Sequence, residues 1–482
     1  MGTLVFLGAG LLAGCRAQAS SPGPAESHQL SLQSAPWHIG ATASLTVRAT
    51  PPLSGQVISL LVLAPGLAQP LVGVPEFYGL SGVQLLWLSP EQRQTEIALA
   101  AASGAKYLSL DFDWRAIEKE PGVYAWGEVD AVVALAKRHN VRLAPMLLFT
   151  PRWASSAAYA PVDYQRAPPT DYAAYRDFVY AVVNRYKPHG VSPLTADGYG
   201  ITDWIIWNEP NVHAKGEAPS PREFWTGSLE AYVQLLRAGY EGAHAADPGC
   251  NVLNGALADV HWDDSGANLV AALERLYDPN GDGNANDGAR PFFDTLNVHT
   301  YPPGQPAAAW YQNRLGAIVG LMKRFGDEQK PIWITETGYG TASGVPSASA
   351  TALPASYVDE QTQADAVRLV YQTCAAYPQV QRVFWWSLRD YYSETSASNP
   401  AMEAHYGLVH VDFSPKPAYL AYGQLTGQLG QSLTLTTTTD AAGLAAANVP
   451  AAFISRSGIY TVFTSLGPLG LTDVARYKVG GR

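Results

Sequence analysis

The stretch Asp203-Trp204-Ile205-Ile206-Trp207-Asn208-Glu209-Pro210 joins a short apolar run to a carboxylate. The run 203–207 is rich in β-branched and aromatic residues and is too short for a helix of average length, so it predicts a buried strand. Glu209 follows at the carboxyl end of that strand. In barrels of parallel strands this is the end at which active-site side chains gather. The stretch therefore predicts both an element of the fold and a candidate site.

The sequence on both sides of this stretch alternates between strand-like and helix-like patterns. Apolar runs typical of strands lie at 78–86, 106–112, 142–149, 203–207, 251–256, 295–299, 332–335 and 383–387. Segments with helical spacing of apolar residues separate them. Eight such units over about 350 residues predict an α/β fold, a (β/α)8 TIM barrel spanning 76–427. A doubly wound open sheet is the alternative, but no Gly-rich phosphate-binding fingerprint follows the first strand.

Strand-like alternation without helical spacing flanks this barrel. Residues 39–75 hold two short apolar runs separated by Pro51-Pro52 and Gly55, and we interpret them as a short β segment. Residues 428–482 alternate in the same way and predict a small accessory β domain. The two segments could share one sheet.

The first residues resemble a bacterial lipoprotein signal. An apolar stretch leads into Leu12-Ala13-Gly14-Cys15, and in such signals the cysteine becomes the lipidated first residue of the mature chain. We therefore interpret 1–15 as a signal and Cys15 as the lipidation site. Residues 16–38 are rich in Ser, Ala, Pro and Gln and predict a disordered tether. Together they imply a protein held at the bacterial cell envelope or cell surface, with the lipid as its only membrane attachment.

Charge and composition restrict the function. The net charge is −10, from 41 acidic and 31 basic residues, which argues against a nucleic-acid partner. The chain has 13 Trp and 26 Tyr, whose flat faces pack well against sugar rings. No cofactor fingerprint is apparent, so we expect that no cofactor is required.

A second carboxylate sits at another predicted strand end. Ile334-Thr335-Glu336-Thr337-Gly338 closes the seventh predicted strand, 127 positions after Glu209. Two such carboxyl groups on one rim are what acetal hydrolysis needs: one protonates the leaving oxygen and the other attacks the anomeric carbon. Asn208 is the right type of group to hydrogen-bond a sugar hydroxyl beside the reacting centre. The structural alternatives are a helix N-terminal acid for Glu209 and a loop carboxylate for Glu336.

These motifs resemble those of clan A glycoside hydrolases, most closely family 39, which includes β-xylosidases and bacterial exopolysaccharide endoglycosidases. The resemblance covers roughly 78–425. The stretches that carry it are Trp207-Asn208-Glu209-Pro210, Ile334-Thr335-Glu336-Thr337-Gly338, the segments 114–126 and 150–154, His299-Thr300-Tyr301-Pro302, Phe384-Trp385-Trp386-Ser387-Leu388-Arg389-Asp390, Tyr406-Gly407-Leu408 and Lys416-Pro417-Ala418-Tyr419.

The resemblance implies a retaining glycosidase that cleaves β-glycosidic bonds of an oligo- or polysaccharide, with Glu209 as general acid/base and Glu336 as nucleophile. It places His299 and Tyr301 near the nucleophile and Trp386 at the floor of the −1 sugar site. Family members commonly carry an Arg on the second strand, where this chain has Ser109. The alternative function is that of a catalytically impaired carbohydrate-binding lipoprotein.

A polar loop precedes the sixth predicted strand. Asp278, Asn280 and Asp282 occupy positions 1, 3 and 5 of a calcium-loop pattern and Gly283 occupies position 6, which suits a structural Ca²⁺. Position 12 is Ala289, which cannot supply the usual bidentate carboxylate. A polar turn without a metal is the alternative.

Overall fold

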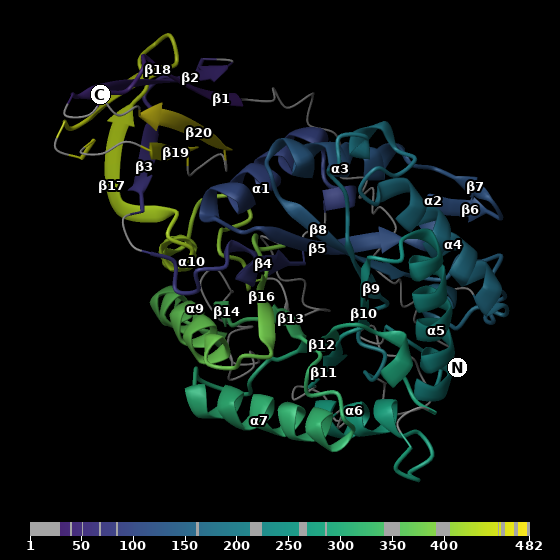
Figure 1. Cartoon of the computed structure of the whole chain (residues 1–482). Coiled ribbons are helices and arrows are strands. Elements are labelled where there is room, and N and C mark those ends of the chain that lie inside the picture. The colour runs from purple at the N-terminus through teal and green to yellow at the C-terminus, as the bar shows by residue number, and fades with distance from the viewer. Residues whose placement is uncertain are drawn as a thin grey trace, which may run out of the picture.

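The computed structural model contains a parallel barrel and a smaller β-rich unit beside it (Figure 1). It describes residues 29–38, 41–50, 52–66, 69–82, 85–160, 163–212, 224–259, 268–284, 287–341, 357–391, 405–451, 453–454, 458–466 and 471–479. The predicted lipidation site Cys15 lies outside the described residues.

Eight of the barrel strands match the eight predicted runs. They are β4 (Tyr78–Ser81), β5 (Tyr107–Asp113), β8 (Arg142–Leu148), β9 (Asp203–Ile206), β10 (Asn251–Asn254), β12 (Leu296–His299), β13 (Ile332–Thr337) and β16 (Val380–Trp386). The strands pair in parallel in the order β10-β9-β8-β5-β4-β16-β13-β12, and the short β11 (Leu257–Ala258) extends the far edge. The predicted α/β barrel with an accessory β unit is confirmed.

The barrel closes between β10 and β12 through side chains as well as backbone. A parallel bridge joins Leu253 to Thr295. The Asn254 side chain donates to the Asn297 carbonyl at 3.0 Å and accepts from the Asn297 amide at 2.8 Å. The buried side-chain amide of Asn254 thus makes the hydrogen bonds to β12 that backbone groups of β10 would make in a regular ladder. The edge of β10 is therefore covered where the barrel closes.

Helices cover the outside of the barrel. They are α1 (Pro90–Ser103), α2 (Trp114–Ile117), α3 (Gly127–Arg138), α4 (Tyr172–Tyr186), α5 (Leu229–Ala246), α6 (Leu269–Tyr277), α7 (Ala308–Arg324), α9 (Glu360–Ala375) and α10 (Pro417–Leu425). Side-chain caps start several of them; Asp171 caps α4 and Ser228 caps α5. Two short pairs of strands lie outside the barrel: β6 (Glu118–Glu120) pairs antiparallel with β7 (Val123–Tyr124), and β14 (Gly340–Thr341) pairs parallel with β15 (Tyr357–Val358).

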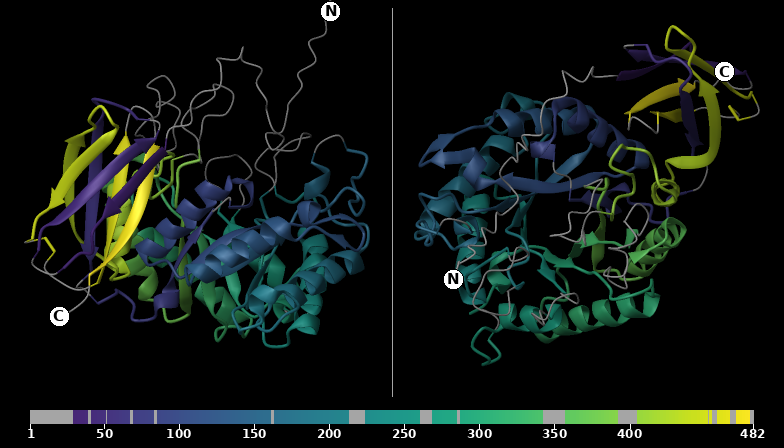
Figure 2. Two further views of the ribbon diagram at one scale, coloured as in Figure 1. Left: turned by 90° about the horizontal axis from the view of Figure 1, so that it is seen from above. Right: turned by 180° about the vertical axis from the view of Figure 1, so that it is seen from behind.

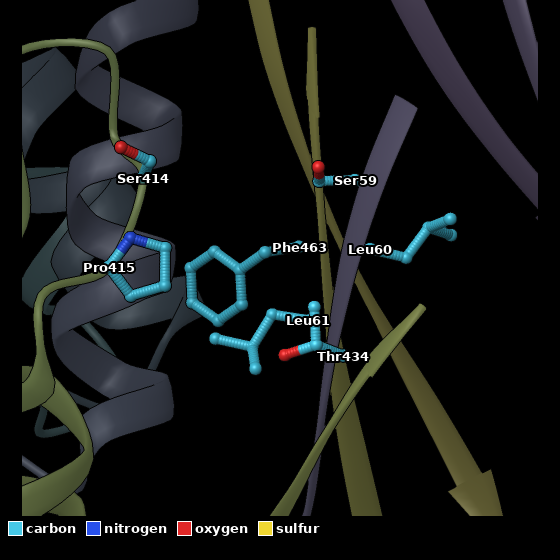
Figure 3. Close-up of a pocket in the computed structure, with 7 residues that line it drawn as sticks. All are labelled: Ser59, Leu60, Leu61, Ser414, Pro415, Thr434 and Phe463. Atoms are coloured by element: carbon cyan, nitrogen blue, oxygen red, sulfur yellow. The ribbon is translucent and has the colours of Figure 1, made fainter. Parts of the chain in front are cut away.

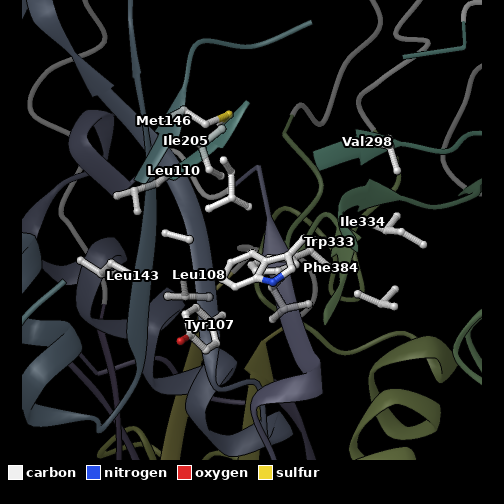
Figure 4. Close-up of a cluster of buried hydrophobic side chains, with 14 of the residues drawn as sticks. Tyr107, Leu108, Leu110, Leu143, Met146, Ile205, Val298, Trp333, Ile334 and Phe384 are labelled. Carbon is white, nitrogen blue, oxygen red and sulfur yellow. The ribbon is translucent and has the colours of Figure 1, made fainter. Parts of the chain in front are cut away.

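The interior of the barrel is filled by large side chains, so it is a packed core (Figure 4). Tyr107 of β5 lies edge-on to Trp333 of β13 at 5.5 Å and to Phe384 of β16 at 6.2 Å. Phe112, on the opposite face of β5, instead contacts Tyr186 of α4. Since side chains alternate along a strand, Ser109 and Asp111 share the interior face with Tyr107.

Strands from both ends of the chain build the accessory unit, where they lie side by side (Figure 2). One sheet has the order β17-β3-β19-β20 and the other β1-β2-β18. The strands are β1 (Gln29–Ser34), β2 (Ala43–Thr50), β3 (Val57–Pro65), β17 (Leu429–Thr438), β18 (Leu444–Val449), β19 (Gly458–Leu466) and β20 (Leu471–Val479). The segments 39–75 and 428–482 therefore share a sheet, because β3 pairs with both β17 and β19.

The predicted disordered tether, 16–38, is wrong over its last part. Residues Gln29–Ser34 form β1, which pairs antiparallel with β2. Leu30 and Leu32 alternate with polar residues and pack on the core between the two sheets. Trp37 is buried and stacks on Tyr477 at 4.9 Å. The prediction failed because the segment is polar in composition, although Leu30 and Leu32 give this edge strand one apolar face.

The accessory unit packs directly on the barrel. Phe463 of β19 lies edge-on to Tyr419 of α10, with ring centroids 5.5 Å apart. A small space of about 190 Å³ remains at this junction (Figure 3), lined by Ser59, Leu60, Leu61, Ser414, Pro415, Thr434 and Phe463. Its lining is apolar apart from three hydroxyl groups, which gives it no group suited to acid–base chemistry.

Two further findings concern cysteines and membranes. Cys250 and Cys374 are buried and unpaired, as expected for isolated core thiols. Among the described helices, none is long and apolar enough to cross a bilayer.

Candidate active site

Four predicted site residues meet at the carboxyl ends of the barrel strands. Glu209 follows β9, Glu336 lies near the end of β13, His299 ends β12, and Tyr301 follows it. Carboxylate oxygens of Glu209 and Glu336 and a ring nitrogen of His299 all lie within 4.8 Å of one another. The two carboxylates are almost closed off from solvent, with side-chain exposures of 11% and 12%. Residues far apart in sequence thus form one compact cluster.

A chain of hydrogen bonds fixes the ring of His299. Nδ1 lies 2.7 Å from Glu209 Oε1, and Nε2 lies 3.1 Å from Thr335 Oγ1. Thr335 Oγ1 in turn donates to Asn297 Oδ1 at 2.7 Å, so it accepts the proton of Nε2. This leaves Nδ1 to share a proton with Glu209. Thr335 and Asn297 were not predicted as site residues from the sequence. The alternation of inward- and outward-facing side chains along β13 and β12 could have indicated that both point into the barrel.

The charges around His299 favour its protonated form. Burial lowers the pKa of His299, but the negative charge of Glu336 and the hydrogen bond and charge of Glu209 raise it by more, so its pKa lies above the usual value. His299 Nδ1 is also 3.4 Å from Glu336 Oε2. A buried imidazole therefore places positive charge between the two carboxylates.

Tyr301 is the direct hydrogen-bond donor to Glu336. Its hydroxyl donates to Oε2 at 2.8 Å. Burial, followed by the charge of Glu336, raises the pKa of Tyr301 well above its usual range. The phenol therefore keeps its proton at all working pH values and holds the Glu336 carboxylate in one orientation.

The backbone around Glu209 is strained. Trp207 and Glu209 have φ values of +74° and +40°, a region that L side chains rarely adopt. Trp207 is fully buried and its indole donates to the Phe224 carbonyl at 2.9 Å. Such strain persists only where the surroundings hold it, and it is typical of functional sites. Here it turns Glu209 to the end of the barrel beside His299.

Aromatic side chains form a wall next to Glu336. Trp386 is half-buried, with its ring 5.1 Å from Tyr406 and 6.2 Å from Tyr301. Tyr357 completes the cluster. Trp385, by contrast, is fully buried and its indole donates to the Tyr406 carbonyl at 3.1 Å. The strand thus turns Trp386 towards the site and Trp385 into the core.

Two predicted positions carry buried polar atoms without partners in the described part of the chain. Asn208 is 5% exposed, and its Oδ1 accepts no hydrogen bond there. Ser109 is fully buried and its Oγ is likewise unpaired. Buried polar groups usually have partners, so such atoms point to an absent ligand or water. Asn208 immediately precedes Glu209, which suits a contact to substrate.

The polar loop after α6 lies at the other end of the barrel, because it leads into the amino end of β12. Asp278 Oδ1 and Oδ2 accept the backbone amides of Asp282 and Gly283 at 3.1 and 2.8 Å. Asp282 Oδ1 accepts from Asn284. The turn is thus closed by protein groups, and Asp278, Asn280 and Asp282 are not brought to the Glu209 cluster.

The only described group of side chains arranged to hold a metal ion is Glu209, His299 and Glu336 themselves. One nitrogen and two oxygens would suit a transition metal. In the structure, His299 Nδ1 is hydrogen-bonded to Oε1 of Glu209, and the Tyr301 hydroxyl is hydrogen-bonded to Oε2 of Glu336. These atoms therefore already have hydrogen-bond partners within the protein.

No family model and no curated protein matches the sequence. Solved structures do match its fold. A family 39 glycoside hydrolase from Bacteroides cellulosilyticus WH2 is 16% identical, with a TM-score of 0.51 over 89% of this chain and 78% of its own. The chain shares the fold of family 39 glycoside hydrolases.

Two further structures agree. A monomeric β-xylosidase from Caulobacter crescentus CB15 is 16% identical, with a TM-score of 0.52 over 83% of this chain and 75% of its own. A GH5_18 protein from Bifidobacterium longum, solved with Manβ1-4GlcNAc, is 14% identical, with a TM-score of 0.52 over 72% of this chain and 77% of its own. At these identities the likeness is one of fold.

Proposed function

We propose that the protein is a retaining glycoside hydrolase that cleaves β-glycosidic bonds by double displacement. The observation that carries the proposal is the pair Glu209 and Glu336, whose carboxylate oxygens lie within 4.8 Å on two strand ends. Retaining enzymes hold their carboxyl groups about 5–5.5 Å apart, whereas inverting enzymes need a wider gap for a water molecule. The fold shared with glycoside hydrolases of several bacteria supports the same class.

The geometry supports a separate role for each carboxylate. Glu336, held as an acceptor by Tyr301, is the nucleophile that attacks the anomeric carbon. Glu209 shares a proton with His299 Nδ1 and gives it to the leaving oxygen as the bond breaks. Water then enters, Glu209 takes its proton as general base, and the glycosyl–Glu336 bond is hydrolysed. His299, Thr335 and Asn297 act as positioning residues for the acid.

Other site residues suit the binding of a sugar. The unpaired Oδ1 of Asn208 can accept a hydroxyl of the ring bound at the nucleophile. The half-buried Trp386 offers an aromatic surface on which that ring can pack. The alternative, a catalytically impaired carbohydrate-binding lipoprotein, is not favoured, since both carboxylates and their partners are in place.

The direct test uses a panel of aryl β-glycosides and β-glycans with the wild type and the Glu336→Gln variant. The wild type should hydrolyse at least one member, and Glu336→Gln should abolish turnover while the melting temperature stays within a few degrees. Gln keeps the shape of the side chain but is not a nucleophile. Equal rates for the two proteins would overturn the assignment.

We propose further that Cys15 is lipidated and tethers the protein to the bacterial cell envelope. The motif Leu12-Ala13-Gly14-Cys15 supports this. The two or three acyl chains of such an anchor give stable membrane binding, which a single chain does not. Mass spectrometry of the native N-terminus should find a diacylglyceryl-modified Cys15. An unmodified N-terminus upstream of Cys15 would contradict the proposal.

A further inference from the structure

Asp111 is a carboxylate on the inner face of the barrel that has no hydrogen-bond or ion-pair partner in the described part of the chain. It lies on β5, on the same face as Tyr107, whose ring contacts the distant strands β13 and β16. Four residues beyond Tyr107, it stands at the carboxyl end of the strand, the end that carries Glu209 and Glu336. Its side chain is partly exposed, and it makes no hydrogen bond or ion pair within the described residues. A structural aspartate in such a position would normally be paired.

Two unpaired hydroxyl groups lie directly below Asp111. Ser109 precedes it by two positions on the same face, and Ser81 stands beside Ser109 on the neighbouring strand β4. Both serines are fully buried, and neither Oγ has a hydrogen-bond partner in the described part of the chain. Trp386 pairs in register with Ser81, so its ring belongs to the same face. The polar groups and the aromatic wall therefore border one region.

Charges nearby restrict what this region can bind. Asp113, on the same strand, is committed to Arg115 through a close pairing that includes a 2.6 Å contact. The facing positions of β8 are Ala144 and Met146, which bring no charge. Burial, followed by the charge of Asp113 and opposed by Arg115, raises the pKa of Asp111 to about 7. An anionic group would meet further repulsion, whereas hydroxyl groups would supply the missing donors.

We propose that Asp111 is a specificity-determining residue that accepts hydrogen bonds from ring hydroxyls of a neutral sugar and selects against uronic acids. The inference rests on the proposed glycosidase function and deepens it, since it names the class of sugar. Ser81 and Ser109 form the polar floor beneath this contact. Asp111 acts in binding the sugar and takes no part in bond cleavage.

The test combines protein variants with substrate variants. kcat/KM is measured for the wild type, Asp111→Asn, Asp111→Ala and the control Glu120→Gln, whose side chain is exposed on the hairpin after the same strand. Each protein is assayed with a neutral aryl β-glycoside that it hydrolyses, its monodeoxy analogues, and the matching uronide. Hydrolysis of any glycoside by the wild type tests the proposed function. The ratios of kcat/KM between the variants and the wild type test the role of Asp111.

We expect Asp111→Ala to lower kcat/KM for the neutral glycoside about 10- to 100-fold, chiefly through KM, with Glu120→Gln unchanged. One deoxy analogue should be poor for the wild type and lose nothing further in Asp111→Ala, because the two changes remove the same contact. The uronide should be the worst substrate of the wild type. In Asp111→Asn, the difference in kcat/KM between the neutral glycoside and the uronide should be smaller. Losses that add for every deoxy analogue, or Asp111 variants within two-fold of the wild type, would overturn the proposal.

A stability measurement separates recognition from a structural role. Folding raises the pKa of Asp111 from about 4 in the unfolded chain to about 7, so this carboxyl group destabilises the fold increasingly as the pH rises between these two values, and Asp111→Asn should raise the melting temperature most at pH 8. The difference should shrink as the pH falls and vanish near pH 4, about the pKa of an aspartate in the unfolded chain. A lower melting temperature for Asp111→Asn at pH 8 would mean that Asp111 supports the fold, and would overturn the proposal.

Discussion

Replacing Tyr301 with Phe removes the hydroxyl that donates a hydrogen bond to Glu336 and keeps the ring. The Tyr301 hydroxyl donates to Glu336 Oε2 at 2.8 Å, while its ring is 8% exposed and packs edge-on against Trp386 and Tyr406. Phe keeps these ring contacts. A hydrogen bond to a charged group contributes about 1.5–3 kcal/mol. At 1.36 kcal/mol per factor of ten, its loss corresponds to about a 10- to 150-fold lower kcat/KM.

The assay is steady-state hydrolysis of an aryl β-glycoside, with thermal unfolding as the control. We expect kcat to carry most of the loss, since Tyr301 orients Glu336, the proposed nucleophile, while the aromatic wall proposed to receive the sugar stays in place. Trp386→Ala is the matched comparison and should act more on KM. A Tyr301→Phe variant within two-fold of the wild type would show that Glu336 needs no such donor and would refute this reasoning.

Three further perturbations test other parts of the molecule. Glu209→Ala should slow glycosides with poor leaving groups far more than activated aryl glycosides, which need little protonation; equal losses across a leaving-group series would contradict its role as acid. If the loop at 278–287 binds Ca²⁺, millimolar Ca²⁺ should raise the melting temperature and EDTA should leave hydrolysis unchanged; no shift would support the polar turn. Lys416→Met should destabilise the fold by about 3–5 kcal/mol, because it removes the ammonium group 2.8 Å from the buried Asp390 and leaves only His405 and His410, each at 3.8 Å, to face that carboxylate. An unchanged unfolding midpoint would contradict this last estimate.

The barrel could be predicted because local and global patterns agree along most of the chain. Each buried strand is a short apolar run, and helical spacing separates one from the next. The ends of the strands were less certain: β13 runs on to Thr337, beyond Glu336, and its pairing with β12 and β16 is irregular in this part of the strand. The segment 29–34 was missed because an edge strand of a small sheet needs only two apolar side chains, Leu30 and Leu32.

The site could be predicted where residues sit next to a strand end in sequence. Glu209 and Glu336 met this condition, the resemblance to clan A glycoside hydrolases added His299 and Tyr301, and the structure brings all four together. The relay from His299 to Asn297 could not be foreseen, because it depends on which inward-facing side chains of neighbouring strands come into register. The same holds for Asp111: that no described residue pairs with it depends on how the barrel packs and could not be predicted from the sequence.

The stereochemistry of hydrolysis tests the central claim most directly. One carboxylate oxygen of Glu209 and one of Glu336 lie within 4.8 Å, a separation that fits retaining rather than inverting enzymes, so the proposed reaction passes through a glycosyl–Glu336 intermediate. ¹H NMR recorded during hydrolysis of a β-glycoside should show the β-anomer of the product first, with the α-anomer appearing only by later mutarotation. A first-formed α-anomer would contradict the account and remove Glu336 from the role of nucleophile.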